Sequence, residues 1–219
     1  MDNLTIGKVL EKLRKVLPQW KVPVVGLMAE RPGDRAFYVL ISTIISLRTK
    51  DAVTEQASVR LFDKAQTPQS IVQLSASEIE KLIYPAGFYR TKAKNILQVC
   101  RLLIDKYQGK VPDQLDQLLE LPGVGRKTAN LVVTVGYDNY GICVDTHVHR
   151  ISNRWGYVKT KTPDETEMAL RQKLPKHFWK TYNDILVTFG QNLCHPTSPW
   201  CSKCPVEKFC PKIGVKRSR

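Results

Sequence analysis

The sequence predicts an all-α protein, and three observations support this fold class. Apolar residues recur every three or four positions along most of the 219 residues, which is the spacing of helices with one buried face. No segment alternates apolar and polar residues in the manner of a half-buried strand. Proline, glycine or serine stands at several breaks in the helical pattern, where these residues end helices or form turns. The length permits one large domain or two small interleaved ones.

The first half of the chain contains both amphipathic and fully apolar helical segments. Residues 36–47 are apolar almost all round, which predicts a central buried helix of about three turns. Further helices are expected over 51–63, 69–74, 76–84 and 91–107. Before them, a helix over 4–17 ends at Pro18 and presents one apolar stripe, made of Leu4, Val9, Leu10, Leu13, Val16 and Leu17.

The second half continues the helical pattern. A short helix follows Pro112 and ends at Pro122 and Gly123. Residues 126–136 are expected to form the next helix, although they include a run of β-branched side chains. The last helices are predicted over 146–155, 164–173 and 178–191.

The chain is strongly basic, with 34 Lys and Arg against 20 Asp and Glu and a net charge of +14. A protein with this charge most often binds a polyanion, and nucleic acid is the first candidate. A solvated basic face, or an acidic protein or membrane partner, is the alternative. The charge is concentrated in two segments. Residues 200–219 contain six basic residues and one acidic residue. Residues 90–110 contain one acidic residue, Asp105, and six basic ones: Arg90, Lys92, Lys94, Arg101, Lys106 and Lys110.

Four cysteines within 17 residues form the pattern C-x6-C-x2-C-x5-C: Cys194, Cys201, Cys204 and Cys210. Disulfides fit this pattern poorly, because no apolar signal segment follows the acidic start of the chain. Structural zinc sites usually pair two C-x2-C knuckles, whereas only one is present here. Ligation by cysteine alone also suits a cubane iron–sulfur cluster. The spacing therefore predicts a metal centre and leaves zinc and iron–sulfur open.

The segment LPGVG at residues 121–125 separates two short helices. Gly123 and Gly125 permit positive φ and remove side chains from the turn. Amide N–H groups would then point outward at the start of the second helix, where the helix dipole also favours an anion such as a DNA phosphate. A plain joint between two helices is the alternative.

Three motifs together resemble the endonuclease III family: LPGVGRKTAN at 121–130, VDTHVHR at 144–150, and the four-cysteine pattern. Members of this family are DNA glycosylases of the helix–hairpin–helix superfamily that carry a [4Fe–4S] cluster. The resemblance extends from about Leu4 to Pro211. It implies a six-helix barrel over 29–139, with the helix–hairpin–helix motif at about 113–136, and a cluster domain formed by 1–28 and 140–219. It also favours a [4Fe–4S] cluster over zinc as the cofactor of the four cysteines.

The resemblance implies a bifunctional DNA glycosylase and apurinic/apyrimidinic lyase of base excision repair. Such an enzyme removes oxidised pyrimidines from double-stranded DNA and cleaves the strand 3′ to the abasic site by β-elimination. The expected partner is double-stranded DNA with damaged bases or abasic sites. We expect a monomer in the cytoplasm, associated with the nucleoid, without a signal or transit peptide, and no membrane span, since no stretch reaches the roughly 18 apolar residues required. The alternatives are a monofunctional glycosylase for mismatched thymine or adenine, and a non-catalytic, cluster-bearing DNA-binding protein.

Lys127 and Asp145 are the catalytic residues that the resemblance implies. A lysine beside Arg126 in a basic protein is otherwise usually a phosphate contact. Attack on C1′ of the nucleotide needs a neutral amine, and an ordinary lysine is neutral in about one molecule in 2,500 at pH 7. Asp145 precedes a helix, where an aspartate commonly serves as the N-cap. Near C1′, its carboxylate would stabilise the positive charge on the sugar and accept the proton of the amine.

Two further residues are predicted to fill the space that an extruded base leaves in the duplex. Arg48 stands in the loop after the apolar helix, where the bacterial pattern has glutamine, and Phe88 stands at a wedge position usually held by leucine. Arginine can still reach and stack on the orphaned base, but the preferred opposite base becomes uncertain. A phosphate contact for Arg48 and a core position for Phe88 are the alternatives. The other predicted DNA contacts are Gly123, Val124, Gly125, Arg126 and Lys203.

Overall fold

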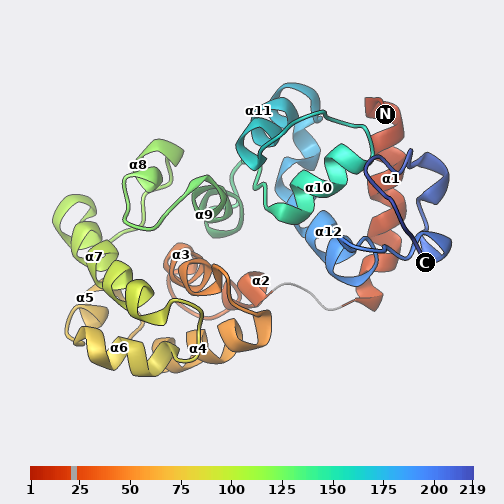
Figure 1. The fold of residues 1–219 in the computed structure, drawn as a ribbon. Coiled ribbons are helices and arrows are strands. Elements are labelled where there is room, and N and C mark those ends of the chain that lie inside the picture. Colours follow the sequence, from red (N-terminus) through yellow and green to blue (C-terminus); the bar gives the residue numbers. More distant parts are fainter. Residues whose placement is uncertain (21–23) are drawn as a thin grey trace. The chain divides into compact units, whose positions relative to one another are not determined.

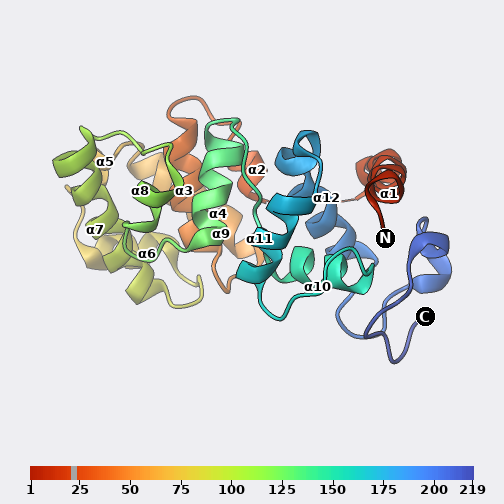
Figure 2. The same cartoon turned by 90° about the horizontal axis from the view of Figure 1, so that it is seen from above.

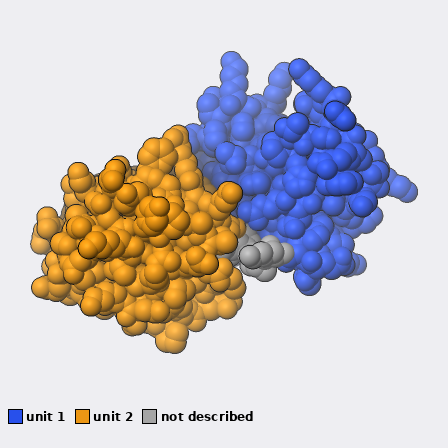
Figure 3. All heavy atoms as spheres, turned by 60° about the horizontal axis from the view of Figure 1, so that its bottom comes forward, with its two compact units in different colours: residues 1–23, 140–219 blue, residues 24–139 orange. Residues whose placement is uncertain are grey.

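The computed structural model describes residues 1–20 and 24–219, with side chains from residue 26 in the second range. Every regular element within these ranges is a helix, which confirms the all-α prediction. The chain divides into two compact units, Met1–Pro23 with Tyr140–Arg219, and Val24–Asn139 (Figure 3). None of the described helices has the length and apolar character needed to cross a membrane.

The unit Val24–Asn139 is built around one apolar helix, α3 (Arg35–Ser46). Its residues 36–45 are all buried, as the sequence predicts for a central helix. Helix α3 packs against α2, α4, α7, α9 and η2 (Figure 1). The other elements of this unit are α2 (Val24–Met28), α4 (Asp51–Lys64), α5 (Pro68–Ile71), α6 (Ala76–Ile83), α7 (Tyr89–Tyr107), α8 (Leu115–Leu119), α9 (Arg126–Leu131) and η2 (Val132–Gly136).

Two features of this unit differ from the sequence-based expectation. Helix α2 was not predicted, and it packs against α3 and α4, so the unit begins at Val24 rather than at residue 29. The helix expected over 126–136 is an α-helix only to Leu131 and continues as the π-helix η2. The change begins at Val132, where an unbroken run of β-branched side chains starts, and such side chains crowd the preceding turn of an α-helix.

The other unit combines the two ends of the chain. Helix α12 (Trp179–Asn192) packs against α1 (Asn3–Val16) and α10 (Thr146–Arg154), and α10 also contacts α11 (Pro163–Lys173) (Figures 1 and 2). Trp155 and Phe189 contribute to the core with ring centroids 6.0 Å apart. Short helices complete the unit: η1 (Leu17–Gln19), η3 (Lys176–Phe178), η4 (Cys201–Lys203) and η5 (Glu207–Phe209).

The buried face of α1 differs from the predicted stripe at Leu4, which is exposed, and at Ile6, which is buried but was not predicted. Leu4 is 80% exposed, so its assignment to the stripe was wrong. At about 100° per residue, Leu4 lies about 200° round the helix from Ile6, on the opposite side. The fully buried side chains of α1 are Ile6, Val9, Leu10 and Leu13.

The same substitution at two leucines of α1 tests this assignment. Leu10→Ala removes a side chain with no exposed surface and should lower the free energy of unfolding by about 2–5 kcal/mol. Leu4→Ala, on the exposed face, should change it by less than about 0.5 kcal/mol. Denaturant titration of both variants measures the difference, and equal losses would contradict the observed orientation of α1.

Candidate active site

The hairpin between α8 and α9 combines two buried residues with two exposed glycines. Leu121 and Val124 are buried, and the Val124 N–H donates a hydrogen bond to the Leu121 carbonyl oxygen at 3.0 Å. That amide therefore stabilises the turn. Gly123 has a φ of 76°, and a Cβ there would lie 2.4 Å from Nδ2 of Asn95. The sequence-based argument for positive φ thus holds at Gly123.

Gly125 has a different role from the one predicted. Its φ is −99° and its ψ is 179°, so it is the extended N-cap of α9, and the expectation of positive φ was wrong. Apart from its two chain neighbours, no residue of the described ranges has a heavy atom within 4 Å of where its Cβ would be. The glycine therefore leaves open space in front of the first turn of α9.

Lys127 lies on that first turn and is half-buried. Thr128, Ala129 and Asn130, which follow it, are all buried. Because α9 packs against both α3 and α8, these residues fix the turn that carries Lys127 and Arg126. The predicted nucleophile thus stands at the edge of the core on a well-anchored helix.

A second lysine of this unit, Lys92, was not identified from the sequence as a site residue. It was counted in the basic segment, but its side chain is only 5% exposed, so it does not contribute to a basic surface. Burial lowers the pKa of Lys92 to about 8. A pattern in the sequence could have revealed this, because Lys92 shares a helical face with Ile96, Val99 and Leu103, which are all buried.

The hydrogen bonds of Lys92 argue against a nucleophilic role. Its Nζ donates to the carbonyl oxygens of Ile45 and Leu47, each at 2.6 Å, and to Oγ1 of Thr49 at 2.8 Å. These three acceptors match the three N–H donors of an ammonium group. A lysine held in this way stabilises the loop around it and presents no lone pair to a substrate.

The structure brings Arg48 and Phe88 together, although 39 residues separate them in the chain. The Arg48 guanidinium carbon lies 5.5 Å from the centroid of the Phe88 ring. Both residues have positive φ, 52° for Arg48 and 56° for Phe88, and both side chains are exposed. Phe88 is 62% exposed, so the alternative of a core aromatic is wrong. The two predicted base-replacing residues form one aromatic and cationic projection.

Asp145 is the N-cap of α10, which confirms the ordinary role that its position suggests. Its Oδ1 accepts hydrogen bonds from the N–H groups of His147 and Val148, at 2.8 and 2.9 Å. The carboxylate is half-buried and held at the start of the helix by these bonds. Asp145 belongs to the unit formed by the chain ends, whereas Lys127 belongs to the other unit.

The four cysteines Cys194, Cys201, Cys204 and Cys210 line one cavity. Apolar side chains of Trp155, Phe189 and Leu193 form part of its wall. Burial raises the pKa of the Cys204 thiol to about 12 and also raises the pKa of Cys194 and Cys210. Within residues 1–20 and 24–219, no three His, Cys, Asp or Glu side chains are grouped closely enough to hold a metal ion.

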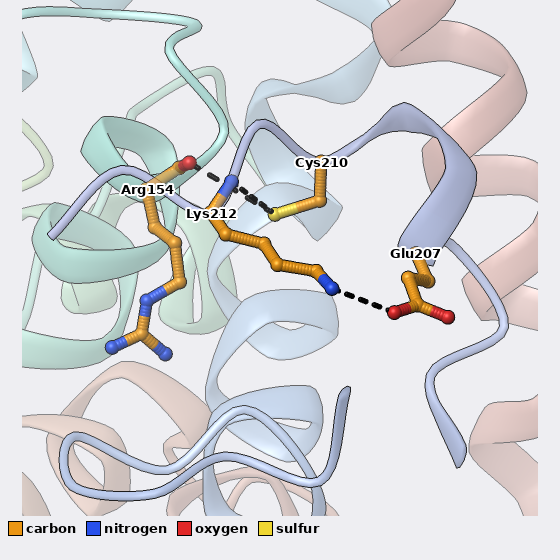
Figure 4. A network of polar contacts seen from close by, with 4 residues as sticks. All are labelled: Arg154, Glu207, Cys210 and Lys212. Atoms are coloured by element: carbon orange, nitrogen blue, oxygen red, sulfur yellow. Dashed lines mark hydrogen bonds and ion pairs between the residues drawn. The ribbon is translucent and has the colours of Figure 1, made fainter. Parts of the chain in front are cut away.

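Two of the thiols, Cys194 and Cys210, accept hydrogen bonds from neighbouring N–H groups. Nη1 of Arg154 donates to Sγ of Cys194 at 3.1 Å and to the carbonyl oxygen of His195 at 3.0 Å. The Lys212 N–H donates to Sγ of Cys210 at 3.4 Å, and Lys212 forms an ion pair with Glu207 at 2.7 Å (Figure 4). In a cubane cluster each cysteine binds a different iron atom, so its four thiols surround a common space. The cavity and its all-cysteine donor set therefore fit such a cluster.

The structure also places the two remaining cysteines and Lys203, the predicted phosphate contact in the cysteine loop. Cys100 and Cys143 are buried thiols in other parts of the fold, as expected. Lys203 is exposed, with its ammonium 4.8 Å from the centroid of the Trp200 ring. The loop thus presents a basic side chain that packs on an aromatic surface.

Comparison with known proteins defines the class. A family model described as "HhH-GPD superfamily base excision DNA repair protein" matches residues 41–176, which include the hairpin, Lys127 and Asp145. The matched region therefore spans both units of the fold. The protein is of the base excision DNA repair class that this superfamily defines.

Individual relatives narrow this class. The chain is 49% identical to endonuclease III of Thermotoga maritima over 80% of this chain and 82% of that protein. It is 45% identical to the chloroplastic endonuclease III homolog 2 of Arabidopsis thaliana over 93% of this chain, but spans only 57% of that longer protein. A trapped endonuclease III–DNA covalent intermediate, an estranged-adenine complex, superposes with a TM-score of 0.85 and 35% identity, covering 97% of both chains. The chain belongs to the endonuclease III family, as its three motifs predict.

Proposed function

We propose that this protein is a bifunctional DNA glycosylase and apurinic/apyrimidinic lyase that removes oxidised pyrimidines from double-stranded DNA. The observation that carries this proposal is the lysine on the first turn after the LPGVG hairpin, Lys127, in a member of the endonuclease III family. A relative of similar fold has been trapped covalently on DNA, which supports a reaction through an amine. The net charge of +14 supports a polyanionic partner.

The reaction follows from the chemistry of an amine and a carboxylate at C1′ of the damaged nucleotide. The neutral Nζ of Lys127 forms a bond to C1′ while the bond from C1′ to the base breaks and the base leaves with the electron pair. Asp145 accepts the proton that the amine loses and stabilises the positive charge on the sugar. The sugar ring then opens, and C1′ and the lysine nitrogen form a Schiff base. A general base removes a proton from C2′, and the 3′ phosphate leaves by β-elimination.

Recognition of DNA is assigned to both units. Exposed backbone at Gly123 and Gly125, together with Arg126, would contact phosphates without reading sequence. Lys203 would do the same from the cysteine loop. Arg48 and Phe88 would occupy the duplex where the target nucleotide is extruded. We further propose that the protein acts on the duplex as a monomer.

The four cysteines would hold a [4Fe–4S] cluster. The cavity that they line and the all-thiol donor set support this assignment. When bound, the cluster would supply a rigid cross-link for the loop of residues 194–210, not a step in the cleavage reaction. Arg154 and the backbone N–H of Lys212, which donate to two of the sulfur atoms, would stabilise the thiolates.

The alternative functions are less well supported. Monofunctional relatives that remove mismatched thymine or adenine generally lack a lysine at the position of Lys127. A DNA-binding protein without activity would have no use for Lys127 together with Asp145. Both alternatives are tested by the same covalent trapping experiment.

Lys127→Gln removes the amine but keeps a polar side chain of similar length. Borohydride should trap a covalent adduct between the parent protein and a duplex with an abasic site, because it reduces the Schiff base. The variant should give no adduct while still binding the duplex. Lys64→Gln, at an exposed lysine of the same unit, is the control and should form the adduct normally. Failure of the parent protein to form any adduct would exclude the lyase.

Asp145→Asn removes the negative charge but keeps the helix cap, because asparagine is as good an N-cap as aspartate. We expect unchanged thermal stability and DNA binding but a base-release rate lower by about 100-fold or more, since charge stabilisation at the sugar is lost. Asp2→Asn, the same change at the N-cap of α1, should leave the rate unaltered. Single-turnover assays measure base release, and a parent-like rate in Asp145→Asn would remove its catalytic role.

Cys204→Ala tests the cluster. The parent protein should contain iron and inorganic sulfide and be brown, and the variant should lose colour, iron and thermal stability. Cys100→Ala, at a buried thiol of the other unit, should retain the iron and the colour. Elemental analysis decides the question, and bound zinc without iron in the parent protein would show that the assignment is incorrect.

A further inference from the structure

Lys92 connects the two loops that carry Arg48 and Phe88. Its side chain, in the first turns of α7, reaches the C-terminal end of α3 and donates to the carbonyl oxygens of Ile45 and Leu47. These carbonyls belong to the last turn and the C-cap of α3, where a positive charge is favourable. The third donor of Lys92 reaches Oγ1 of Thr49, directly after Arg48.

The same lysine also contacts the second loop through its backbone. The Lys92 N–H donates to the carbonyl oxygen of Phe88 at 3.0 Å. Oγ1 of Thr49 accepts a further hydrogen bond from the Gly87 N–H at 3.0 Å. Thr49, which follows Arg48, is therefore bonded directly to Gly87, which precedes Phe88. Lys92 is bonded to Thr49 of the first loop and to Phe88 of the second.

The two loops approach as closely as their backbones allow. A Cβ on Gly87 would lie 2.5 Å from the backbone oxygen of Arg48, so only glycine fits there. Arg48 and Phe88 both adopt left-handed backbone conformations, which non-glycine residues keep only where their surroundings hold them. The buried lysine and the Thr49 hydroxyl provide these surroundings.

We propose that Lys92 and Thr49 form a positioning clamp that holds Arg48 and Phe88 as one preformed wedge for extrusion of the target base. This inference rests on the proposed function and assigns a role to two residues that do not touch the substrate. A long arginine side chain has many rotamers, and fixing its backbone beside an aromatic ring reduces the ordering required when it enters the duplex. Burial lowers the pKa of Lys92 to about 8, so its ammonium remains largely protonated at neutral pH and can make all three bonds.

The clamp should affect base extrusion more than cleavage at an abasic site. Extrusion requires unstacking and unpairing of a base, whereas an abasic nucleotide has no base to unstack. The ratio of base-release rate on a damaged duplex to lyase rate on an abasic duplex of the same sequence therefore reports on the wedge. A general loss of folded protein lowers both rates equally and leaves the ratio unchanged.

Thr49→Val and Thr49→Ser form the matched pair for this test. Valine keeps the shape of threonine but removes the oxygen that bonds to Lys92 and Gly87, whereas serine keeps it. We expect Thr49→Val to lower the ratio about tenfold or more, because small displacements of positioning groups are costly. Thr49→Ser should retain the parent ratio. Single-turnover rates, normalised to the active fraction that borohydride traps on the abasic duplex, give the ratio.

Lys92→Met should reproduce the effect of Thr49→Val, and Lys94→Met, an equal loss of charge on the exposed face of α7, should leave the ratio unchanged. In an Arg48→Ala background, Thr49→Val should have a smaller effect on the ratio, because one of the two residues that the clamp positions is already removed.

Equal loss of both rates in Thr49→Val, or an effect that persists in full after Arg48→Ala, would overturn the clamp. If Lys92→Met does not fold, the Thr49 pair decides the question alone. A parent protein inactive on both duplexes would refute the proposed function itself. Failure of the clamp instead appears as normal parent rates with an unchanged ratio in the variants.

Discussion

The burial of residues 36–45 of α3 is the constraint on which the unit Val24–Asn139 depends. A helix that is apolar all round must be covered on every side, and α2, α4, α7, α9 and η2 provide that cover. This enclosure places the turn that carries Lys127 against the core through α9. It also brings the start of α7 to the C-terminal end of α3, where the Arg48 loop begins. The positions of the predicted catalytic lysine and of the proposed wedge thus both depend on the burial of α3.

Burial of that helix end creates a second requirement, because carbonyl groups at a helix C-terminus have no partners within the helix. The ammonium group of Lys92 donates hydrogen bonds to two of these carbonyl groups and to the Thr49 hydroxyl. A lysine with a lowered pKa is often taken as a sign of catalysis. Here the hydrogen bonds identify it as a structural cation, so geometry decides what the pKa alone leaves open.

In the unit formed by the chain ends, helix α10 connects two predicted sites. Asp145 caps its N-terminus, and Arg154 in its last turn donates to Sγ of Cys194. Arg150, between them, donates to the carbonyl oxygen of Cys194 at 2.8 Å. The conformation of the cysteine loop is therefore tied by direct hydrogen bonds to the helix that Asp145 begins. A carboxylate used as a cap is also a carboxylate with a defined position, which a role at C1′ would require.

The sequence by itself determined the helical class, the approximate span of most helices and, through three motifs, the family. These properties depend on local periodicity and on side chains close together in the chain, which a reader of the sequence can see. Only the tertiary structure decided that Leu4 lies on the exposed face of α1, that Gly125 is an extended cap, and that α9 continues as a π-helix. It alone showed which groups the Lys92 ammonium bonds and that Arg48 lies against Phe88. The partners of Lys92 and the contact between Arg48 and Phe88 join residues far apart in the chain, and such contacts leave no periodic signal in either segment alone.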